Sequence, residues 1–343
     1  MYRTTSVAPP VAASPFSIFW ITDTQFLSES NPLLYSLMTS WIVENWTRFN
    51  GKLVIHTGDV VQDGTRQVEW ENANEAMSIL LQNGIPYTWC AGNHDNVTEG
   101  DPISGWNGNQ WAQSFNPPAV MDRVNALKYT NWVSDYHTGM NTAVKFTANG
   151  LNFLVVNIEW EAQPDVLEWV GSVLNDPAYA DHSVIIAPHA YIDAYGMLND
   201  PRYGATLSAF TDGLTGLMDA SPNVFLTLNG HFASECGYNT PAPVNGRNEL
   251  MFDRQDCTDD PNNPTGRGVD SATPETKDGN KVGGATVTIL TFDTANNKVS
   301  ANTYDAYTSN WRTDADERYA FKMFSTGGAG SSGAGGGTRG TLP

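Results

Sequence analysis

Basic residues are scarce in this 343-residue chain, which has 18 lysines and arginines against 37 aspartates and glutamates and a formal net charge of −19. A charge of this sign repels nucleic acids and anionic membrane surfaces, so we expect neither as a partner. The chain also lacks an apolar run of about 18 residues, so no insertion into a membrane is predicted. If the substrate is a phosphate, a bound metal has to supply the positive charge that the chain lacks.

Cysteine is also rare, with three residues in the chain. Cys90 lies in an apolar stretch, which indicates a small buried side chain. Cys236 and Cys257 flank a polar, turn-rich segment, and the sequence is compatible with a disulfide between them and with two free thiols. The outcome depends on the separation of their Cα atoms, which sequence spacing does not fix.

Composition divides the chain into one domain between two linker-like ends. Residues 1–15 are rich in Pro, Ala and Ser, and residues 326–343 are rich in Gly and Ser. Residues 16–325 carry the apolar periodicity of a folded domain. This arrangement predicts part of a larger secreted protein, placed outside the cell or attached to its surface. The alternative is that the composition of the two ends says nothing about a larger protein.

Five apolar stretches, each predicted to be a buried strand, are followed directly by polar residues. Those residues are, in chain order, Asp23 with Gln25, Asp59, Asn93, His189 and His231. In open α/β sheets, ligands bind where the carboxyl ends of the strands meet, so we expect these side chains to converge. Their oxygen and nitrogen atoms suit a divalent cation, and Asp59 is expected to be the central ligand.

Strands and helices alternate through the first half of the chain. A loop over 26–31, a helix capped near Ser30 and a second helix over 66–83 separate the first three strands, which indicates parallel pairing with right-handed crossovers. Residues 96–141 are expected to be irregular. An irregular segment of this length in a compact domain is usually a lid or a functional loop. The second half contains further strands and helices, which indicates a second, mixed sheet packed on the first.

The order of these motifs resembles that of the calcineurin-like metallophosphoesterase family. The matching motifs are Asp-Thr-Gln at 23–25, Gly-Asp at 58–59, Gly-Asn-His-Asp at 92–95, Pro-His at 188–189 and Gly-His at 230–231. The resemblance implies an α/β fold, a four-layer α/β/β/α sandwich of two mixed sheets flanked by helices, with two metals above the sheets. Asp59 would bridge both metals, and the second metal would be bound by Asn93, His189 and His231.

The first metal would be bound by Asp23, Gln25 and a histidine that this chain lacks. The family's Gly-His-x-His motif ends here in Ala233, and the family's other imidazole on this metal is replaced by Gln25. The remaining oxygen ligands favour Mg, Ca or Mn over Zn, and water, Ser234 or Glu235 are candidates to complete the set. We therefore predict one strong and one weakened site, holding one or two divalent ions (Mn, Fe, Zn, Mg or Ca).

The predicted function is hydrolysis of phosphate monoesters or diesters of small molecules by a metal-activated hydroxide, which includes phosphodiesterase activity. The resemblance implies that His94 is catalytic and protonates the leaving group or steadies the phosphoryl oxygens. Asp95 is expected to orient its imidazole. The alternative is a catalytically degenerate, metal-stabilised structural or interaction protein on the same scaffold. The absence of a histidine at Ala233 favours that alternative, whereas the intact His94 favours the enzyme.

Several further residues have weaker signals. Asp23 also fits a turn or helix cap, Gln25 a loop cap, and His94 a structural imidazole beside the metal. His56 is expected in the core, and His137 and His182 in solvent, with His137 a weak candidate for contact with the cleft. Glu159 and Trp160 follow a buried strand at the same edge and are candidates to face substrate. Four aromatic side chains of the irregular segment either line a cleft or pack the segment itself: Trp106, Trp111, Phe115 and Tyr136.

Overall fold

Two seven-stranded sheets form the centre of the molecule. The computed structural model describes residues 14–99, 101, 117–193, 196–198, 204–232, 237–239, 242–255, 284–313 and 317–324. The predicted linkers therefore lie almost entirely outside the described residues, as do Ala233, Ser234, Glu235, Cys236 and Cys257. Trp106, Trp111 and Phe115 lie outside them as well.

The first sheet has the strand order β13-β12-β11-β1-β2-β3, with β14 also paired to β12. Its parallel part is made of β1 (Phe16–Ile21), β2 (Gly51–His56) and β3 (Tyr87–Trp89). The strand β11 (Thr286–Asp293) pairs antiparallel with β1 and continues into β12 (Lys298–Asp305), β13 (Asn310–Trp311) and β14 (Arg318–Lys322). All six residues of β1 are buried, as expected for a strand covered on both faces.

The second sheet has the order β4-β5-β6-β7-β8-β10-β9. Its parallel centre is β6 (Leu151–Ile158), β7 (Ser183–Pro188), β8 (Val224–Asn229) and β10 (Asn248–Phe252). Antiparallel strands complete it at both sides: β4 (Thr130–Tyr136) and β5 (Asn141–Ala148) at one, and β9 (Gly237–Asn239) at the other.

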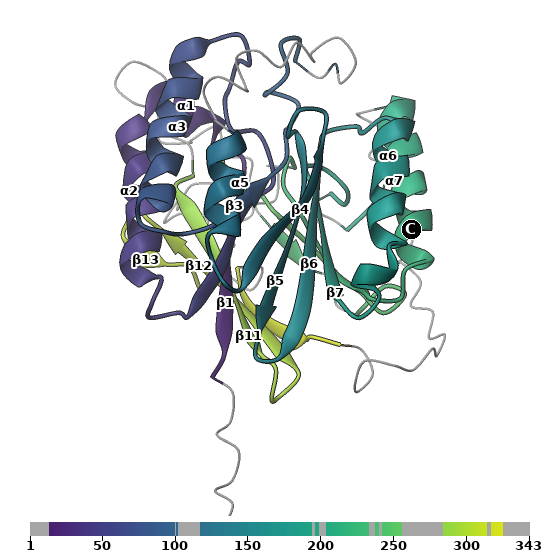
Figure 1. The fold of residues 1–343 in the computed structure, drawn as a ribbon. Helices are drawn as coiled ribbons and strands as arrows, with labels where there is room; N and C mark the ends of the chain where they lie inside the picture. The colour runs from purple at the N-terminus through teal and green to yellow at the C-terminus, as the bar shows by residue number, and fades with distance from the viewer. Residues whose placement is uncertain are drawn as a thin grey trace, which may run out of the picture.

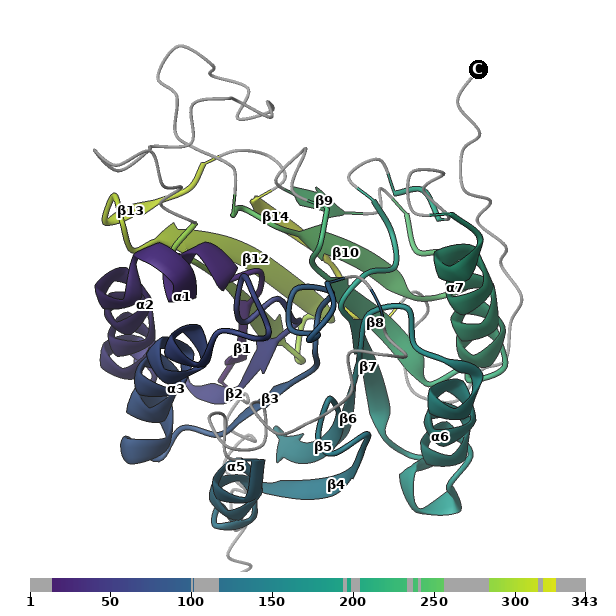
Figure 2. The ribbon, with the colours of Figure 1, turned by 90° about the horizontal axis from the view of Figure 1, so that it is seen from above.

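Helices cover the outer faces of both sheets (Figures 1 and 2). The first sheet is covered by α1 (Gln25–Ser30), α2 (Pro32–Asn45) and α3 (Gln67–Gln82), and α5 (Pro117–Asn125) lies near β3 and β4. The second sheet is covered by α6 (Pro164–Leu174) and α7 (Gly204–Asp219), and a 3-10 turn, η1, spans Pro177–Tyr179. The predicted α/β/β/α sandwich is confirmed.

Aromatic side chains join the two sheets. Phe16 of β1 stacks on Phe292 of β11 with ring centroids 5.0 Å apart, and both contact Phe153 of the second sheet. Phe16 and Phe153 lie near the amino ends of β1 and β6, so this apolar layer joins the two sheets at the end of the strands away from their carboxyl ends. No helix in the described part of the chain combines the length and apolar character needed to cross a membrane.

Two local predictions are wrong. The loop expected at 26–31 is largely the short helix α1, whereas the next helix begins near Ser30 as expected, with Asn31 at its N-cap. The segment expected to be irregular contains α5 and β4. Both elements are short and partly exposed, so they lack the long apolar periodicity on which sequence interpretation depends.

Candidate metal centre

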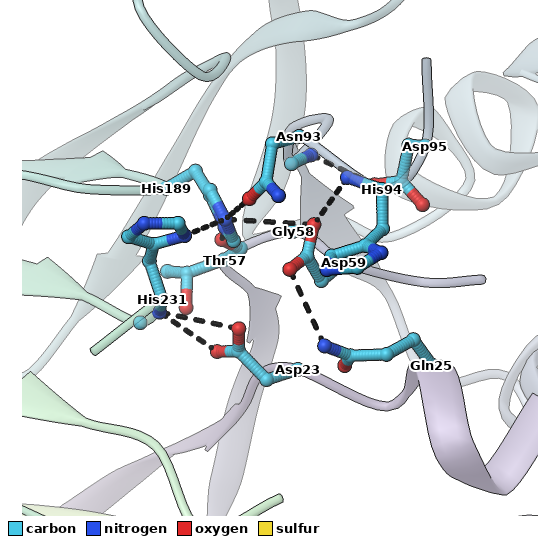
Figure 3. Close-up of polar contacts among 12 residues, drawn as sticks. Asp23, Gln25, Thr57, Gly58, Asp59, Asn93, His94, Asp95, His189 and His231 are labelled. Carbon is cyan, nitrogen blue, oxygen red and sulfur yellow. Dashed lines mark hydrogen bonds and ion pairs between the residues drawn. The ribbon is translucent and has the colours of Figure 1, made fainter. Parts of the chain in front are cut away.

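Five strands from both sheets bring polar side chains to the same rim. Asp23 follows β1, Asp59 follows β2, Asn93 follows β3, His189 follows β7 and His231 follows β8. Figure 3 shows these side chains facing one another across the junction of the two sheets. The convergence expected from the sequence is therefore present.

Four ligand atoms surround one point between the sheets. His189 Nε2 lies 3.0 Å from Asn93 Oδ1, 3.2 Å from His231 Nδ1 and 3.5 Å from Asp59 Oδ1. Ligand atoms of Asp59, His189 and His231 all lie within 4.8 Å of one another. Tetrahedral metal bonds of about 2.1 Å place ligand atoms about 3.4 Å apart, so these spacings fit a divalent cation.

His189 is held in the orientation that a metal ligand needs. Its ring Nδ1 donates a hydrogen bond to the Thr57 carbonyl oxygen at 2.8 Å, which directs Nε2 towards the centre of the cluster. The indole of Trp160 lies beside His231, with ring centroids 4.3 Å apart. Trp160 is buried, so it encloses the cluster on that side.

Three of these residues have strained backbones. Asp23, Asp59 and His231 have φ angles of 50°, 51° and 74°, in the left-handed region that side chains other than glycine rarely adopt. A Cβ atom at Gly92 would overlap the Asp59 carboxylate, and one at Gly230 would overlap that of Asp23. Strain of this kind is typical of sites where function fixes the backbone.

Burial and charge hold the cluster in defined protonation states. Burial opposes the ionisation of Asp59, but the positive charges of His189 and His94 hold the pKa of its carboxyl well below its usual range. Burial likewise lowers the pKa of His189, but the charge of Asp59 outweighs it and raises that pKa to about 10. Without a cation, a proton on His189 thus balances Asp59, as a bound metal would.

The oxygen ligands predicted for the first metal are arranged differently. Both carboxylate oxygens of Asp23 accept the backbone N–H of His231 at 3.1 Å. Gln25 begins α1, and its Nε2 donates to Asp59 Oδ2 at 3.4 Å. Its Oε1 is buried and has no hydrogen-bond partner among the residues that the structure describes. A buried amide oxygen without a donor fits a cation beside Asp59, so Gln25 also suits this role.

Asp253 is a residue that the sequence interpretation missed. It follows β10 directly and is fully buried. Because Met251 of β10 lies opposite Asn229 of β8, Asp253 falls beside the segment that carries His231. Burial raises the pKa of Asp23, and the charge of Asp253 raises it further. The missed signal was the same one used elsewhere, a carboxylate directly after an apolar strand.

His94 lies next to the cluster and is oriented by Gln62. Its backbone N–H donates to Asp59 Oδ1 at 3.0 Å, and its ring Nδ1 lies 3.0 Å from the Gln62 carbonyl oxygen. Its Nε2 lies 3.6 Å from Glu99 Oε1. Burial lowers the pKa of His94, but the charges of Asp59 and Glu99 outweigh it and raise that pKa above its usual value.

The expectation that Asp95 orients the His94 imidazole is wrong. The Asp95 carboxylate instead accepts the backbone N–H groups of Val60, Val61 and Gly92, at 2.8, 3.0 and 2.7 Å. Burial and the charge of Asp59 raise the pKa of Asp95 to about 7. Asp95 therefore ties the loop after β2 to the loop after β3 and so positions Asp59 and Asn93.

The other histidines have structural partners. His56 is buried in the core as predicted, and burial lowers its pKa to about 3. His137 and His182 are not simply solvated: His137 lies 3.0 Å from Glu159 and 3.1 Å from Asp165, and His182 lies 2.8 Å from Asp181. Glu159 is bound to His137 and Asn141, so its buried carboxylate has a structural role.

Comparison with known proteins finds one sequence family and one longer relative that resemble this chain. The sequence model of the calcineurin-like phosphoesterases matches residues 16–208. The uncharacterised protein YvnB of Bacillus subtilis (strain 168) is 27% identical over 298 residues, 87% of this chain and 20% of YvnB. This chain thus spans about a fifth of that relative's length.

Two solved structures resemble the fold. A dimetal phosphatase from Danio rerio has a TM-score of 0.54 at 13% identity and covers 90% of this chain and 100% of its own. The purple acid phosphatase PPD1 from yellow lupin seeds has a TM-score of 0.52 at 13% identity, with 90% and 54% coverage. At this identity the two structures support the fold alone.

Proposed function

Because the chain belongs to the calcineurin-like phosphoesterase family, we propose that it hydrolyses phosphate monoesters or diesters of small molecules in a metal-dependent reaction. The observation that carries this proposal is the convergence of Asp59, Asn93, His189 and His231 on one point. A divalent cation bound there would supply a nucleophilic hydroxide and neutralise phosphoryl charge. The metal is left open among Mn, Fe, Zn, Mg and Ca.

The chain's own residues prepare the site for an anionic substrate. Asn93 is a neutral ligand, so a cation held with Asp59 and two imidazoles keeps net positive charge. This local charge offsets the repulsion that the chain's net charge of −19 exerts on a phosphate. Trp160 covers His231 on one side and excludes water there, which strengthens the electrostatic interactions of the cluster.

His94 is proposed to protonate the leaving oxygen. The Gln62 carbonyl oxygen holds the Nδ1 side of the ring, so Nε2 is the atom that can give a proton to the substrate. The Glu99 carboxylate lies 3.6 Å from Nε2 and can stabilise the protonated imidazole before substrate binds. Asp95 contributes by fixing the backbone on which Asp59 and Asn93 stand.

We also propose that one metal site is strong and the other weakened. The strong site has two imidazoles, an amide and a carboxylate. The weakened one has Asp23, Gln25 and shared Asp59, with Asp253 buried nearby and alanine at 233. Its oxygen ligands favour Mg, Ca or Mn. Metal analysis after dialysis is expected to find one retained ion per chain, and two equally retained ions would contradict this part of the proposal.

A panel of aryl phosphate monoesters and diesters with added Mn tests the enzymatic function. Turnover is expected with at least one ester class and is expected to fall in Asn93→Ala and His94→Ala. The second candidate is a degenerate, metal-stabilised interaction protein, favoured by the absence of an imidazole at 25 and 233. Metal binding without turnover under any metal, or turnover unchanged in both variants, would support that candidate instead.

An extracellular or cell-surface location, as part of a larger secreted protein, remains a proposal from the sequence. It is supported by the linker-like composition of residues 1–15 and 326–343. The similarity to one part of the much longer YvnB is compatible with it. Detection of the protein in the culture medium or at the cell surface by fractionation tests this proposal, and its recovery only from the cell interior would contradict it.

A further inference from the structure

A cavity lies on the outer face of the first sheet, away from the metal centre. It has a volume of about 380 Å³ and is lined by residues that follow α2 and by residues of the strands from β11 to β14. They are Arg48, Phe49, Ile289, Thr291, Asn302, Trp311, Arg312 and Arg318. Its volume lies within the range of about 300–1,000 Å³ common for small-molecule sites. Figure 2 shows β13 beside α2 at this side of the molecule.

The strand register separates this cavity from the metal centre. Ile289 and Thr291 pair with Phe19 and Ser17, which lie in the middle and near the start of β1. The metal ligand Asp23 follows the other end of that strand. A ligand in the cavity is therefore bound independently of the ions at the rim.

The charge of the cavity is opposite to that of the chain. Among the residues that the structure describes, three arginines and no carboxylate line it, although the chain has 37 acidic and 18 basic residues. Arg312 is buried and donates from Nε to Glu317 at 2.9 Å, and Glu317 also pairs with Arg254.

The two exposed arginines, Arg48 and Arg318, have no ion-pair partner among the described residues. Arg318 lies opposite Asn302 of β12, and Asn302 lies opposite Ile289 of β11, so these residues form a row across three strands. The buried Arg247 provides a contrast, because it is bound to both Asp219 and Glu249. Arg48 and Arg318 are thus available to an oxyanion, which guanidinium groups bind with paired hydrogen bonds.

An aromatic wall stands beside these charges. Trp311 is 40% exposed, and three other aromatic rings support it: Trp41, Phe49 and Tyr304, with centroids 5.8, 6.0 and 5.3 Å away. All three contacts are edge-on or T-shaped. A supported and partly exposed indole can stack on a flat ring.

We propose that this cavity binds a small anionic ligand in which a flat ring carries a phosphate or carboxylate group. Arg48 and Arg318 bind the oxyanion, and Trp311 stacks on the ring. Asn302 and Thr291 supply polar contacts on the floor of the cavity. The inference is independent of phosphoester hydrolysis, because none of these residues belongs to the metal centre.

Calorimetric titration of the full chain tests the site. The protein is first stripped of metal with a chelator and dialysed, so that the rim cannot contribute metal-dependent binding. The probes are adenosine 5′-monophosphate, benzoate and inorganic phosphate. We expect either ringed anion to bind at least about tenfold more tightly than inorganic phosphate, because only these can stack on Trp311. The comparison of adenosine monophosphate with benzoate identifies the preferred oxyanion.

Three variants localise the binding. The double variant Arg48→Ala/Arg318→Ala is expected to bind the preferred ringed anion at least about tenfold more weakly, because two charge-assisted contacts are lost. Trp311→Ala is expected to remove the preference for ringed anions over inorganic phosphate. Arg123→Ala, on α5 and outside the cavity, is the matched control and should bind as the wild type does. Binding of no ringed anion, or equal binding by the double variant and the control, would overturn the proposal.

Discussion

The two halves of the metal rim differ in both chemistry and order. In one half, Asp59, Asn93, His189 and His231 direct their ligand atoms at a common point. In the other, Asp23 binds the backbone of His231, and Gln25 stands on a six-residue helix. The first half offers nitrogen and oxygen, whereas the second offers oxygen alone.

This difference is the basis for the proposal that the two halves hold metal with different strength. The nitrogen-containing half is fixed by its own contacts, since the Thr57 carbonyl orients His189 and the Asp95 carboxylate holds the loops of Asp59 and Asn93. In the oxygen half, no described residue donates a hydrogen bond to the amide oxygen Gln25 Oε1. A preorganised ligand set binds metal more tightly, because less order has to be imposed on binding.

Among the changes predicted here, removal of His189 should have the largest effect on metal binding and activity. His189→Ala is expected to reduce retained metal to near zero and to abolish phosphoesterase activity, because Nε2 contacts all three other ligand atoms of the strong half. Elemental analysis and an aryl phosphate assay measure the two effects. His182→Ala, which removes another largely buried imidazole far from the rim, is the control and should retain metal. A His189→Ala protein with wild-type metal content would show that the cluster is not the strong site.

Removal of His94 should separate catalysis from metal binding. His94→Ala is expected to lower kcat by about 10²–10⁴-fold with unchanged metal content, because the proton donor is lost and the ligands stay. The loss should be smaller for p-nitrophenyl phosphate than for phenyl phosphate, since the better leaving group needs less protonation. Equal losses for both substrates would count against proton donation by His94.

Restoring imidazoles should make the two halves more alike. Gln25→His combined with Ala233→His gives the weak half the two nitrogens that the family pattern contains. The double variant is expected to retain about one additional ion per chain after dialysis, measured by elemental analysis, because imidazole ligands suit transition metals. The single variant Ala233→Ser serves as the control. No gain of metal in the double variant would show that missing imidazoles do not weaken this half.

The smallest effect is expected at the His137 contact beside the rim. Hydrogen bonding to Glu159 raises the pKa of His137 despite partial burial, so the charged imidazole stabilises the folded state. This contribution is complete below the unfolded pKa of about 6.5 and is lost as pH rises through the higher folded value. The melting temperature should therefore fall slightly from pH 6 to 9, and less so in His137→Gln. An identical fall in the variant would exclude His137 as its source.

The sequence predicted the main parts of this arrangement for a simple physical reason. Apolar runs such as 16–21 and 53–56 have to be buried, and parallel pairing places the residues that follow them at one edge. Convergence of Asp59 with His189 and His231 follows from that rule. Side-chain direction does not follow from it, because Asp95 turns to three backbone N–H groups that no local pattern reveals.

Other features depended on contacts between distant parts of the chain. The helix α1 has six residues and no side-chain hydrogen bond at its N-cap, so its formation depends on packing against α2 and α3. Asp253 reaches the rim because β10 pairs with β8, a pairing across a long sequence separation. The contact of His137 with Glu159 and Asp165 likewise joins three separate elements.

The left-handed backbone at Asp23, Asp59 and His231 bears on how such a centre changes over generations. Glycine adopts that conformation without strain, so exchanging one of these ligands for glycine would relieve backbone energy while it removes chemistry. The same exchange at Asp23 or Asp59 would leave the backbone N–H group of His231 or His94 without its carboxylate acceptor. Backbone strain and hydrogen bonding therefore act in opposite directions on the stability of such a variant.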